Sequence, residues 1–246
     1  QMSSNVLILG ATSAIARGTA AAFAARGDNL YLASRDLEEL KRIAADLNVR
    51  YGVKVSYGLF DAAATDTHPA FFQSVLKEMH ELNGVVLAFG LLGDQQAARE
   101  FSVAEKIIAS NFTGAVSILS LCANYFEPLK RGFIIGISSV AGDRGRQSNY
   151  VYGAAKGALS IYLQGLRNRL FPSGVRVVTI KPGFVDTAMT FGLPGLFLVA
   201  SPQQIGEAIA RTLNKSADVV YLPGFWRYIM LIIKHIPEPI FKRLKL

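Results

Sequence analysis

Cysteine is almost absent from this chain of 246 residues, because Cys122 is the only one. A single thiol cannot close an intrachain disulfide, and it cannot build a cysteine-rich zinc site. Histidine is also scarce: His68, His80 and His235 are scattered without the spacing of metal ligands. The sequence therefore predicts neither a disulfide-bonded domain nor a metal centre.

Charged residues are few, and acidic residues are the scarcer kind. Only 18% of the residues are charged, and 26 Lys and Arg against 18 Asp and Glu give a net charge of +8. Because 51% of the chain is hydrophobic, a disordered protein is excluded. The basic excess favours an anionic partner, which could be nucleic acid, a membrane surface or a phosphorylated ligand.

A leader peptide and a membrane-spanning helix are also missing from the sequence pattern. The first residues have no basic region and no long apolar run, so we expect no signal peptide. Two uncharged stretches, 107–126 and 187–206, are interrupted by polar residues or by glycine and proline. We expect a buried helix and a loop there rather than membrane spans, and hence a cytoplasmic protein that is at most peripheral at the inner face of a membrane.

Short apolar runs alternate with helical patterns along the chain. The predicted strands are 5–9, 30–33, 53–59, 84–89, 133–137, 175–180 and 219–222, and the predicted helices are 14–26, 37–50, 70–81, 103–126, 150–171 and 202–213. This alternation predicts an α/β fold: a single Rossmann-type, doubly wound parallel sheet of about seven strands with helices on both faces. We expect one catalytic domain over 1–223 and a basic, hydrophobic tail over 224–246.

A small-residue turn, Gly10-Ala-Thr-Ser-Ala-Ile-Ala16, joins the first strand to the first helix. Backbone N–H groups at such a turn, together with the helix N-terminus, can bind a pyrophosphate. The expected contacts are Gly10, Thr12, Ser13, Ala14 and Ile15. Alanines stand at 14 and 16, where a dinucleotide fingerprint usually has glycines, so a plain small-residue turn is an open alternative.

The second strand ends in Ser34 and Arg35, where the adenosine ribose lies in a dinucleotide-binding fold. A hydroxyl and a guanidinium suit a 2′-phosphate, so the sequence favours NADP(H). Asp36 follows at once and would suit the free ribose of NAD(H), which leaves that cofactor possible. A structural alternative is that Asp36 caps the next helix while Arg35 is solvated.

The strongest chemical signal combines a serine pair at a strand end with a tyrosine and a lysine on a helix. Ser138 and Ser139 end the strand 133–137, and Tyr152 and Lys156 lie four residues apart on one helix face. A nearby ammonium favours the phenolate and should lower the tyrosine pKa. Because adjacent strand residues point to opposite faces, only one serine can share the substrate oxygen.

Over residues 5 to about 223 the chain resembles the short-chain dehydrogenase/reductase family. The matching positions are Gly10, Asp61, Ala88-Phe89-Gly90, Asn111, Ser139, Tyr152, Lys156 and Pro182-Gly183-Phe-Val-Asp-Thr187. The resemblance implies that Tyr152 is the acid/base in hydride transfer between NAD(P)(H) and a carbonyl. It implies that Ser139 orients the carbonyl, that Lys156 binds the nicotinamide ribose, and that Asn111 holds a water.

The same resemblance implies further cofactor contacts and an assembly. The cofactor contacts would come from Asp61, Ala88, Phe89, Gly90, Pro182, Gly183, Val185 and Thr187. A substrate lid is implied over 188–200, which is apolar and uncharged and would exclude water. A homodimer or homotetramer is expected through the helices 103–126 and 150–171.

A narrower resemblance is carried by residues 88–94, 142–149 and 225–237. These segments are similar to the decaprenylphosphoryl-2-keto-ribose reductase branch. That likeness implies a keto sugar carried on a polyprenyl phosphate, and a flavin-dependent oxidase as the partner that makes the ketone. It also implies NADH as the cofactor, in contrast to the NADPH that Ser34 and Arg35 favour. The alternatives are a soluble reductase of a small metabolite and a non-catalytic nucleotide-binding scaffold.

The tail at 224–246 holds five basic residues and one acid among many aromatic and aliphatic side chains. This mixture is typical of a segment at anionic lipid headgroups, although the tail could instead cover the core or an oligomer contact. Nucleic acid is not expected, because the positive charge accompanies aliphatic side chains. Arg144 and Arg146, near the serine pair, are candidate phosphate ligands or members of a solvated loop.

Overall fold

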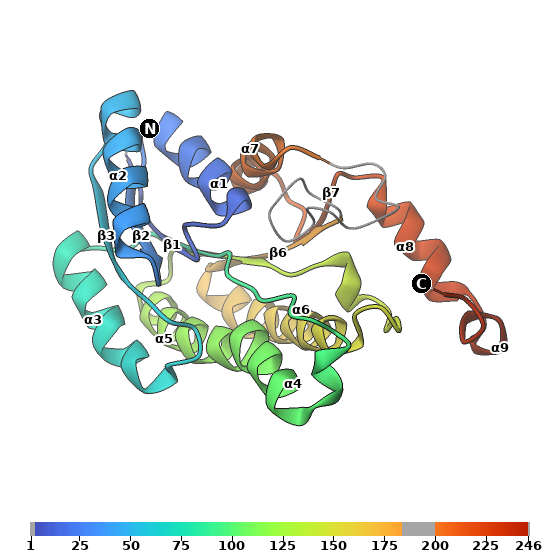
Figure 1. Ribbon diagram of the computed structural model, residues 1–246. Helices are drawn as coiled ribbons and strands as arrows, with labels where there is room; N and C mark the ends of the chain where they lie inside the picture. The colour runs from blue at the N-terminus through green and yellow to red at the C-terminus, as the bar shows by residue number, and fades with distance from the viewer. Residues whose placement is uncertain (1–2, 184–199, 246) are drawn as a thin grey trace.

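The computed structural model describes residues 3–183 and 200–245, and these residues form one parallel sheet between two helical layers (Figure 1). The strands are β1 (Asn5–Leu9), β2 (Asn29–Ser34), β3 (Val55–Leu59), β4 (Gly84–Leu87), β5 (Phe133–Ile137), β6 (Arg176–Pro182) and β7 (Val219–Leu222). Their order is β3-β2-β1-β4-β5-β6-β7, and every pairing is parallel. The predicted fold class is confirmed.

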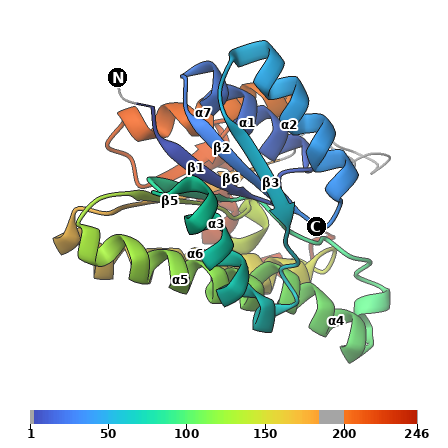
Figure 2. The same ribbon diagram turned by 90° about the vertical axis from the view of Figure 1, so that its left-hand side faces the viewer.

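Both faces of the sheet are covered by helices (Figures 1 and 2). One layer contains α1 (Ala14–Ala25), α2 (Leu37–Tyr51) and α7 (Pro202–Arg211); the other contains α3 (His68–Met79), α4 (Phe101–Ile108), α5 (Gly114–Leu129) and α6 (Tyr150–Leu170). Along β1, Val6 and Ile8 belong to the first core, and Leu7 and Leu9 to the second. Burial on both faces explains why the strands are continuous apolar runs.

The predicted elements between 5 and 222 are all present, with ends displaced by at most three residues. β6 extends to Pro182 because that residue still pairs with Leu222 of β7. The tail, for which no helix was predicted, forms α8 (Trp226–His235) and the short α9 (Glu238–Phe241). A π-helical turn over Ala109–Thr113, also not predicted, separates α4 from α5.

The continuous helical segment Phe101–Leu129 is long and apolar enough to cross a membrane by length and composition. In the fold it is a core helix. Its side chains Ile118, Leu119, Cys122 and Phe126 are fully buried in the second core. The buried helix that the sequence predicted at 107–126 is therefore confirmed.

The strand order reverses between β1 and β4, whose connections lead to opposite faces of the sheet. In doubly wound sheets a crevice opens at this point, beyond the carboxyl ends of the strands. The residues that follow β1, β2, β3 and β4 converge at this edge, and a cavity lies between them. The topology thus places the candidate nucleotide site.

Candidate active site

Ser138 and Ser139 follow β5 and take different roles. The buried Ser138 hydroxyl donates to the Lys156 carbonyl at 2.9 Å and shares a 2.7 Å hydrogen bond with Ser160. Ser139 is half-buried; its hydroxyl accepts from the Ala141 N–H at 3.1 Å and lies close enough to Tyr152 to lower the pKa of that phenol. Only Ser139 therefore lies with the tyrosine, because Ser138 is committed to α6.

Tyr152 and Lys156 lie one turn apart near the start of α6, and both side chains are buried. The Lys156 ammonium donates to the Ile137 carbonyl at 3.1 Å and lies 5.9 Å from the centre of the Tyr152 ring. Burial raises the pKa of Tyr152 to about 12, opposed by the Ser139 hydrogen bond. Burial also lowers the pKa of Lys156 to about 8.

The structure gives the opposite direction to the expected effect of Lys156, because burial raises the pKa of Tyr152. The ammonium is directed at a backbone carbonyl, and loss of water penalises the phenolate and the ammonium alike. At neutral pH Tyr152 is a neutral phenol. A phenol in this state is equipped to donate a proton to a developing alkoxide.

Asn111 is fully buried in the π-helical turn and ties the loop after β4 to the long helix. Its amide donates to the carbonyls of Leu91 at 2.7 Å and Ile107 at 2.8 Å, and its oxygen accepts from the Leu91 N–H at 3.2 Å. A Cβ placed on Gly90 would lie 2.9 Å from the Asn111 oxygen and 3.2 Å from the Lys156 nitrogen. Gly90, Asn111 and Lys156 therefore meet in one place.

The turn after β1 has the shape of a nucleotide cradle. Gly10 adopts φ +79°, and a Cβ there would lie 2.6 Å from the Phe89 nitrogen, so only glycine fits. Ser13 caps α1 by accepting from the Ala16 N–H at 3.2 Å. Ala14 and Ile15 form the first turn of α1, directly behind this cap.

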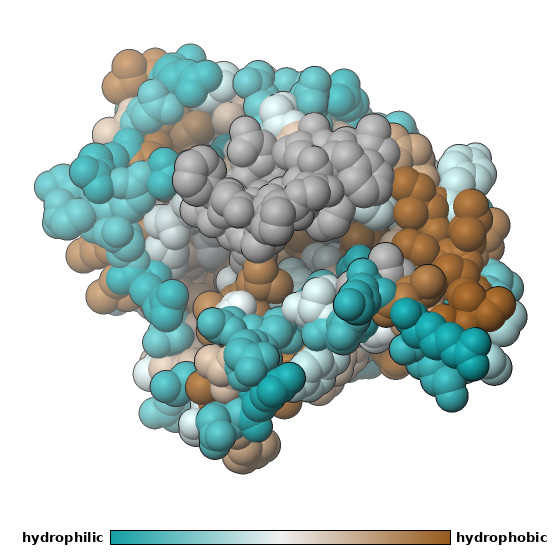
Figure 3. Space-filling view, turned by 45° about the vertical axis from the view of Figure 1, so that its right-hand side comes forward, coloured by the Kyte–Doolittle hydropathy of each residue, from teal (hydrophilic) through white to brown (hydrophobic). Residues whose placement is uncertain are grey.

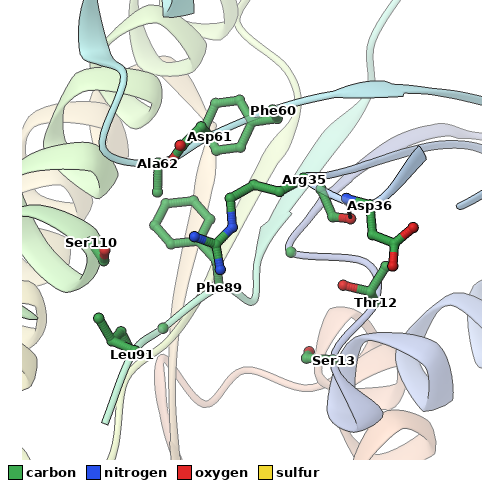
Figure 4. Close-up of a pocket in the computed structure, with 13 residues that line it drawn as sticks. Thr12, Ser13, Arg35, Asp36, Phe60, Asp61, Ala62, Phe89, Leu91 and Ser110 are labelled. Carbon is green, nitrogen blue, oxygen red and sulfur yellow. Dashed lines mark hydrogen bonds between the residues drawn. The ribbon is translucent and has the colours of Figure 1, made fainter. Parts of the chain in front are cut away.

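A cavity of about 300 Å³ extends from this turn across the ends of β2, β3 and β4 (Figure 4). Eight of the predicted cofactor residues line it: Gly10, Thr12, Ser13, Ser34, Arg35, Asp61, Phe89 and Gly90. Asp36, the alternative ribose ligand, lines it as well, together with four residues that the sequence analysis did not assign to cofactor binding: Phe60, Ala62, Leu91 and Ser110. Phe60, Ala62 and Leu91 are sequence neighbours of predicted cofactor residues and follow the ends of β3 and β4. Their position after these strands was therefore a signal from which the sequence could have predicted them as cavity residues.

The side chains of Arg35 and Asp36 point in different directions. The Arg35 side chain reaches across the cavity towards Phe89, whereas Asp36 lies on the opposite side near Thr12 (Figure 4). The Asp36 carboxylate accepts from the Glu39 N–H at 2.9 Å and caps α2. Its role as a helix cap, one of the two alternatives from the sequence, is therefore confirmed.

The other predicted cofactor residues occupy the surroundings of the cavity. The Asp61 carboxylate accepts from the Ala63 N–H at 2.9 Å, and the Ala88 carbonyl accepts from Ser13 at 3.5 Å. Pro182 is the last residue of β6, and Gly183 follows it at the same edge of the sheet as the cavity. Gly183 lies so close to Trp226 that a Cβ there would overlap the indole ring. Val185, Thr187 and the lid 188–200, apart from Ala200, lie outside the described residues.

Arg144 was predicted either to bind a phosphate or to belong to a solvated loop, and the structure gives it partners in the tail instead. One guanidinium nitrogen donates to the carbonyls of Ile233, Lys234 and Ile236, and the other pairs with Glu238 at 2.8 Å. Because these partners occupy the guanidinium, Arg144 anchors the tail. Arg146 differs: it is half-buried, its Nε has no hydrogen-bond partner among residues 3–183 and 200–245, and burial lowers its pKa.

The sheet topology, the cradle at Gly10 and the clustered serine, tyrosine and lysine define a nucleotide-dependent oxidoreductase. A family model of the short chain dehydrogenases matches residues 4–193. An uncharacterized oxidoreductase of Streptomyces coelicolor is 35% identical over 98% of this chain and 95% of its own length. The chain belongs to the short-chain dehydrogenase/reductase family and is an NAD(P)-dependent oxidoreductase.

Two solved structures of the same fold carry bound cofactors. A short-chain dehydrogenase from Sphingobium yanoikuyae in complex with NADPH has a TM-score of 0.75 and 25% identity, covering 96% of this chain and 97% of its own. NAD+-bound xylitol dehydrogenase has a TM-score of 0.80 and 18% identity, covering 89% and 97%. Structures of this fold therefore hold either nicotinamide cofactor.

Proposed function

We propose that the protein reduces a ketone to a secondary alcohol with NADPH. The observation that carries this proposal is the pairing of Ser139 with a buried, neutral Tyr152 at the sheet edge that also forms the nucleotide cavity. When bound, NADPH supplies the hydride that reaches the carbonyl carbon. Ser139 would hold the carbonyl oxygen, and Tyr152 would donate the proton that balances the reaction.

Lys156 and Asn111 support that chemistry in different ways. Lys156 would hold the nicotinamide ribose and stabilise the phenolate that Tyr152 becomes after proton donation. Asn111 positions Gly90 and Leu91, and so fixes the wall of the cavity beside Lys156. A water in the proton relay near Asn111 is part of the proposal. Pro182, Gly183, Val185 and Thr187 would contact the carboxamide side of the cofactor.

The preference for NADPH rests on Arg35. Its guanidinium reaches into the cavity, while one oxygen of the Asp36 carboxylate accepts the Glu39 N–H at the start of α2. The planar guanidinium can bind a 2′-phosphate through two parallel hydrogen bonds. The NADPH-bound relative at 25% identity supports the same choice.

Arg35→Ala is expected to lower kcat/KM for NADPH by about 10- to 100-fold, because a charge-assisted hydrogen bond contributes about 1.5–3 kcal/mol. The value for NADH should change little. Steady-state kinetics with both cofactors measure this, and Arg42→Ala on the same helix layer is the control. A wild-type preference for NADH would contradict the argument.

For the substrate, we propose a ketone that carries a phosphate and an apolar chain, as a polyprenyl-phosphate-linked keto sugar does. The resemblance of segments 88–94, 142–149 and 225–237 to keto-ribose reductases supports this choice. Arg146 adds a physical reason: it lies in the loop between Ser139 and Tyr152, and its buried Nε has no hydrogen-bond partner within the described part of the chain. A buried guanidinium N–H that lacks an acceptor is costly, and an anionic substrate group would supply that acceptor.

The substrate proposal is tested by comparing a phosphate-bearing keto sugar on a short polyprenyl chain with neutral ketones. NADPH oxidation should be much faster with the phosphorylated compound. Arg146→Gln should raise its KM by about 10-fold or more, the scale of a lost charged hydrogen bond, without affecting neutral ketones. Arg131→Gln, at the opposite sheet edge, is the matched control. Equal turnover of both classes would favour the alternative, a reductase of a small metabolite.

A further inference from the structure

The tail segment 224–245 has two different sides. On one side Trp226 and Met230 are buried against Val140, and Ile229 and Ile233 are half-buried there. On the other side α8 exposes Tyr228 and Ile232 by 68% each and Leu231 by 56%, and Ile240 in α9 is 55% exposed. The buried side explains how the tail is attached. It does not explain why the outer side is apolar as well.

Basic residues surround this exposed apolar area. Arg227, Lys234, Lys242, Arg243 and Lys245 are all exposed, and within the described residues none has a salt-bridge partner. The one acid of the tail, Glu238, is neutralised by Arg144. The surface of the tail is therefore strongly cationic.

Charge and hydrophobicity lie side by side on this surface. In Figure 3 a hydrophobic area covers the right-hand side of the molecule, over α8, beside hydrophilic side chains. A groove of about 420 Å³ lies between Tyr221, Arg227, Tyr228, Leu231 and Lys234. Its two cations and two tyrosine rings could receive a phosphate headgroup, while Leu231 faces the same space.

The tail is held rigidly to the catalytic domain. Arg144 donates to three carbonyls at the end of α8, and its guanidinium lies 3.8 Å from the centre of the Phe241 ring. Trp226 packs on Gly183 at the sheet edge that carries the site. The exposed side is thus presented in a fixed orientation next to the candidate active site.

We propose that α8 and α9 dock the protein on an anionic lipid bilayer, with Tyr228, Leu231, Ile232 and Ile240 at the headgroup level. Aliphatic and aromatic side chains interleaved with cations match such an interface. A symmetric contact with a second copy is disfavoured, because it would bring the five exposed cations of one tail against the five of the other. The proposal stands whether or not the ketone itself is lipid-linked.

Vesicle co-sedimentation of the full chain tests the proposal, using vesicles of phosphatidylcholine with or without phosphatidylglycerol. The protein should bind the phosphatidylglycerol vesicles, and binding should weaken with salt. Lys242→Glu/Arg243→Glu/Lys245→Glu should lower the partition coefficient at least about tenfold, since each cation near an anionic surface contributes roughly fivefold. Leu231→Glu/Ile232→Glu should lower it similarly.

Matched controls are Lys41→Glu/Lys77→Glu/Lys106→Glu for charge and Val49→Glu, in α2, for apolar exposure. Absence of wild-type binding, equal binding to neutral vesicles, or unchanged binding of the tail variants would overturn the proposal. A change of oligomeric state in Leu231→Glu/Ile232→Glu during analytical ultracentrifugation would also overturn it, because the surface would then be a contact between copies. Ketone turnover in detergent is measured separately, so failure of the proposed reaction is distinguishable from failure to bind lipid.

Discussion

Tyr152→Phe is expected to reduce ketones with a kcat about 10²–10⁴ times lower than the wild-type protein, which is the contribution of a positioned general acid. The substitution removes only the phenolic hydroxyl, and the ring continues to fill its buried site between Ala98, Ile107 and Ala141. Cofactor binding should therefore change little. Single-turnover reduction and NADPH fluorescence titration measure the two quantities.

Tyr150→Phe provides a matched control for this substitution. Tyr150 lies on the same helix, two residues earlier, but its side chain is exposed. The control should keep its activity, and both variants should have wild-type circular dichroism. Turnover by Tyr152→Phe close to that of the control would show that another group donates the proton.

Lys156→Met is expected to abolish turnover while raising the free energy of unfolding at pH 7 by about 2 kcal/mol. Lowering the lysine pKa from 10.5 to about 8 costs the folded protein about 3 kcal/mol below pH 8. The variant also loses the hydrogen bond to the Ile137 carbonyl, which lowers its free energy of unfolding by about 1 kcal/mol and leaves a net increase of about 2 kcal/mol. Removing a functional group would thus stabilise the ligand-free protein.

The pH dependence of this difference gives an independent measurement. Between pH 8 and 10.5 the unfolded chain keeps the Lys156 proton and the folded protein releases it, so wild-type stability rises with pH relative to the variant. The difference in free energy of unfolding between Lys156→Met and the wild type should therefore decrease by about 1.4 kcal/mol per pH unit, as measured by urea titrations. Tyr152 and Cys122 lower stability at high pH in both proteins, because burial raises their pKa values. If this difference in free energy of unfolding stayed constant with pH, Lys156 would not be desolvated in the folded protein.

The prediction of the catalytic serine shows how far local pattern can reach. Strand alternation required Ser138 and Ser139 to point in opposite directions, and the structure directs Ser138 into α6 and leaves Ser139 beside Tyr152. The i,i+4 spacing of Tyr152 and Lys156 likewise placed both on one side of α6. These relations depend only on backbone geometry, which the sequence pattern reports directly.

The electrostatics of the same residues could not be predicted in this way. Sequence spacing put an ammonium near a phenol, but it gave no information on the Ile137 carbonyl that receives the ammonium or on the loss of water at both groups. The orientation of the tail could not be predicted either, because each of its residues could face the core or solvent. Contacts from Arg144, 89 to 94 residues away in the chain, decide which side is free.

The sequence by itself determined the alternation of strands and helices, the positions of the site residues along that alternation and the excess of positive charge in the tail. The tertiary structure decided that Arg35 enters the cavity and that Arg144 binds the tail rather than a phosphate. The physical reason is the sequence separation over which each property is set. Hydrophobic periodicity and capping are local, whereas burial, side-chain direction and pKa values depend on groups that only the folded chain brings together.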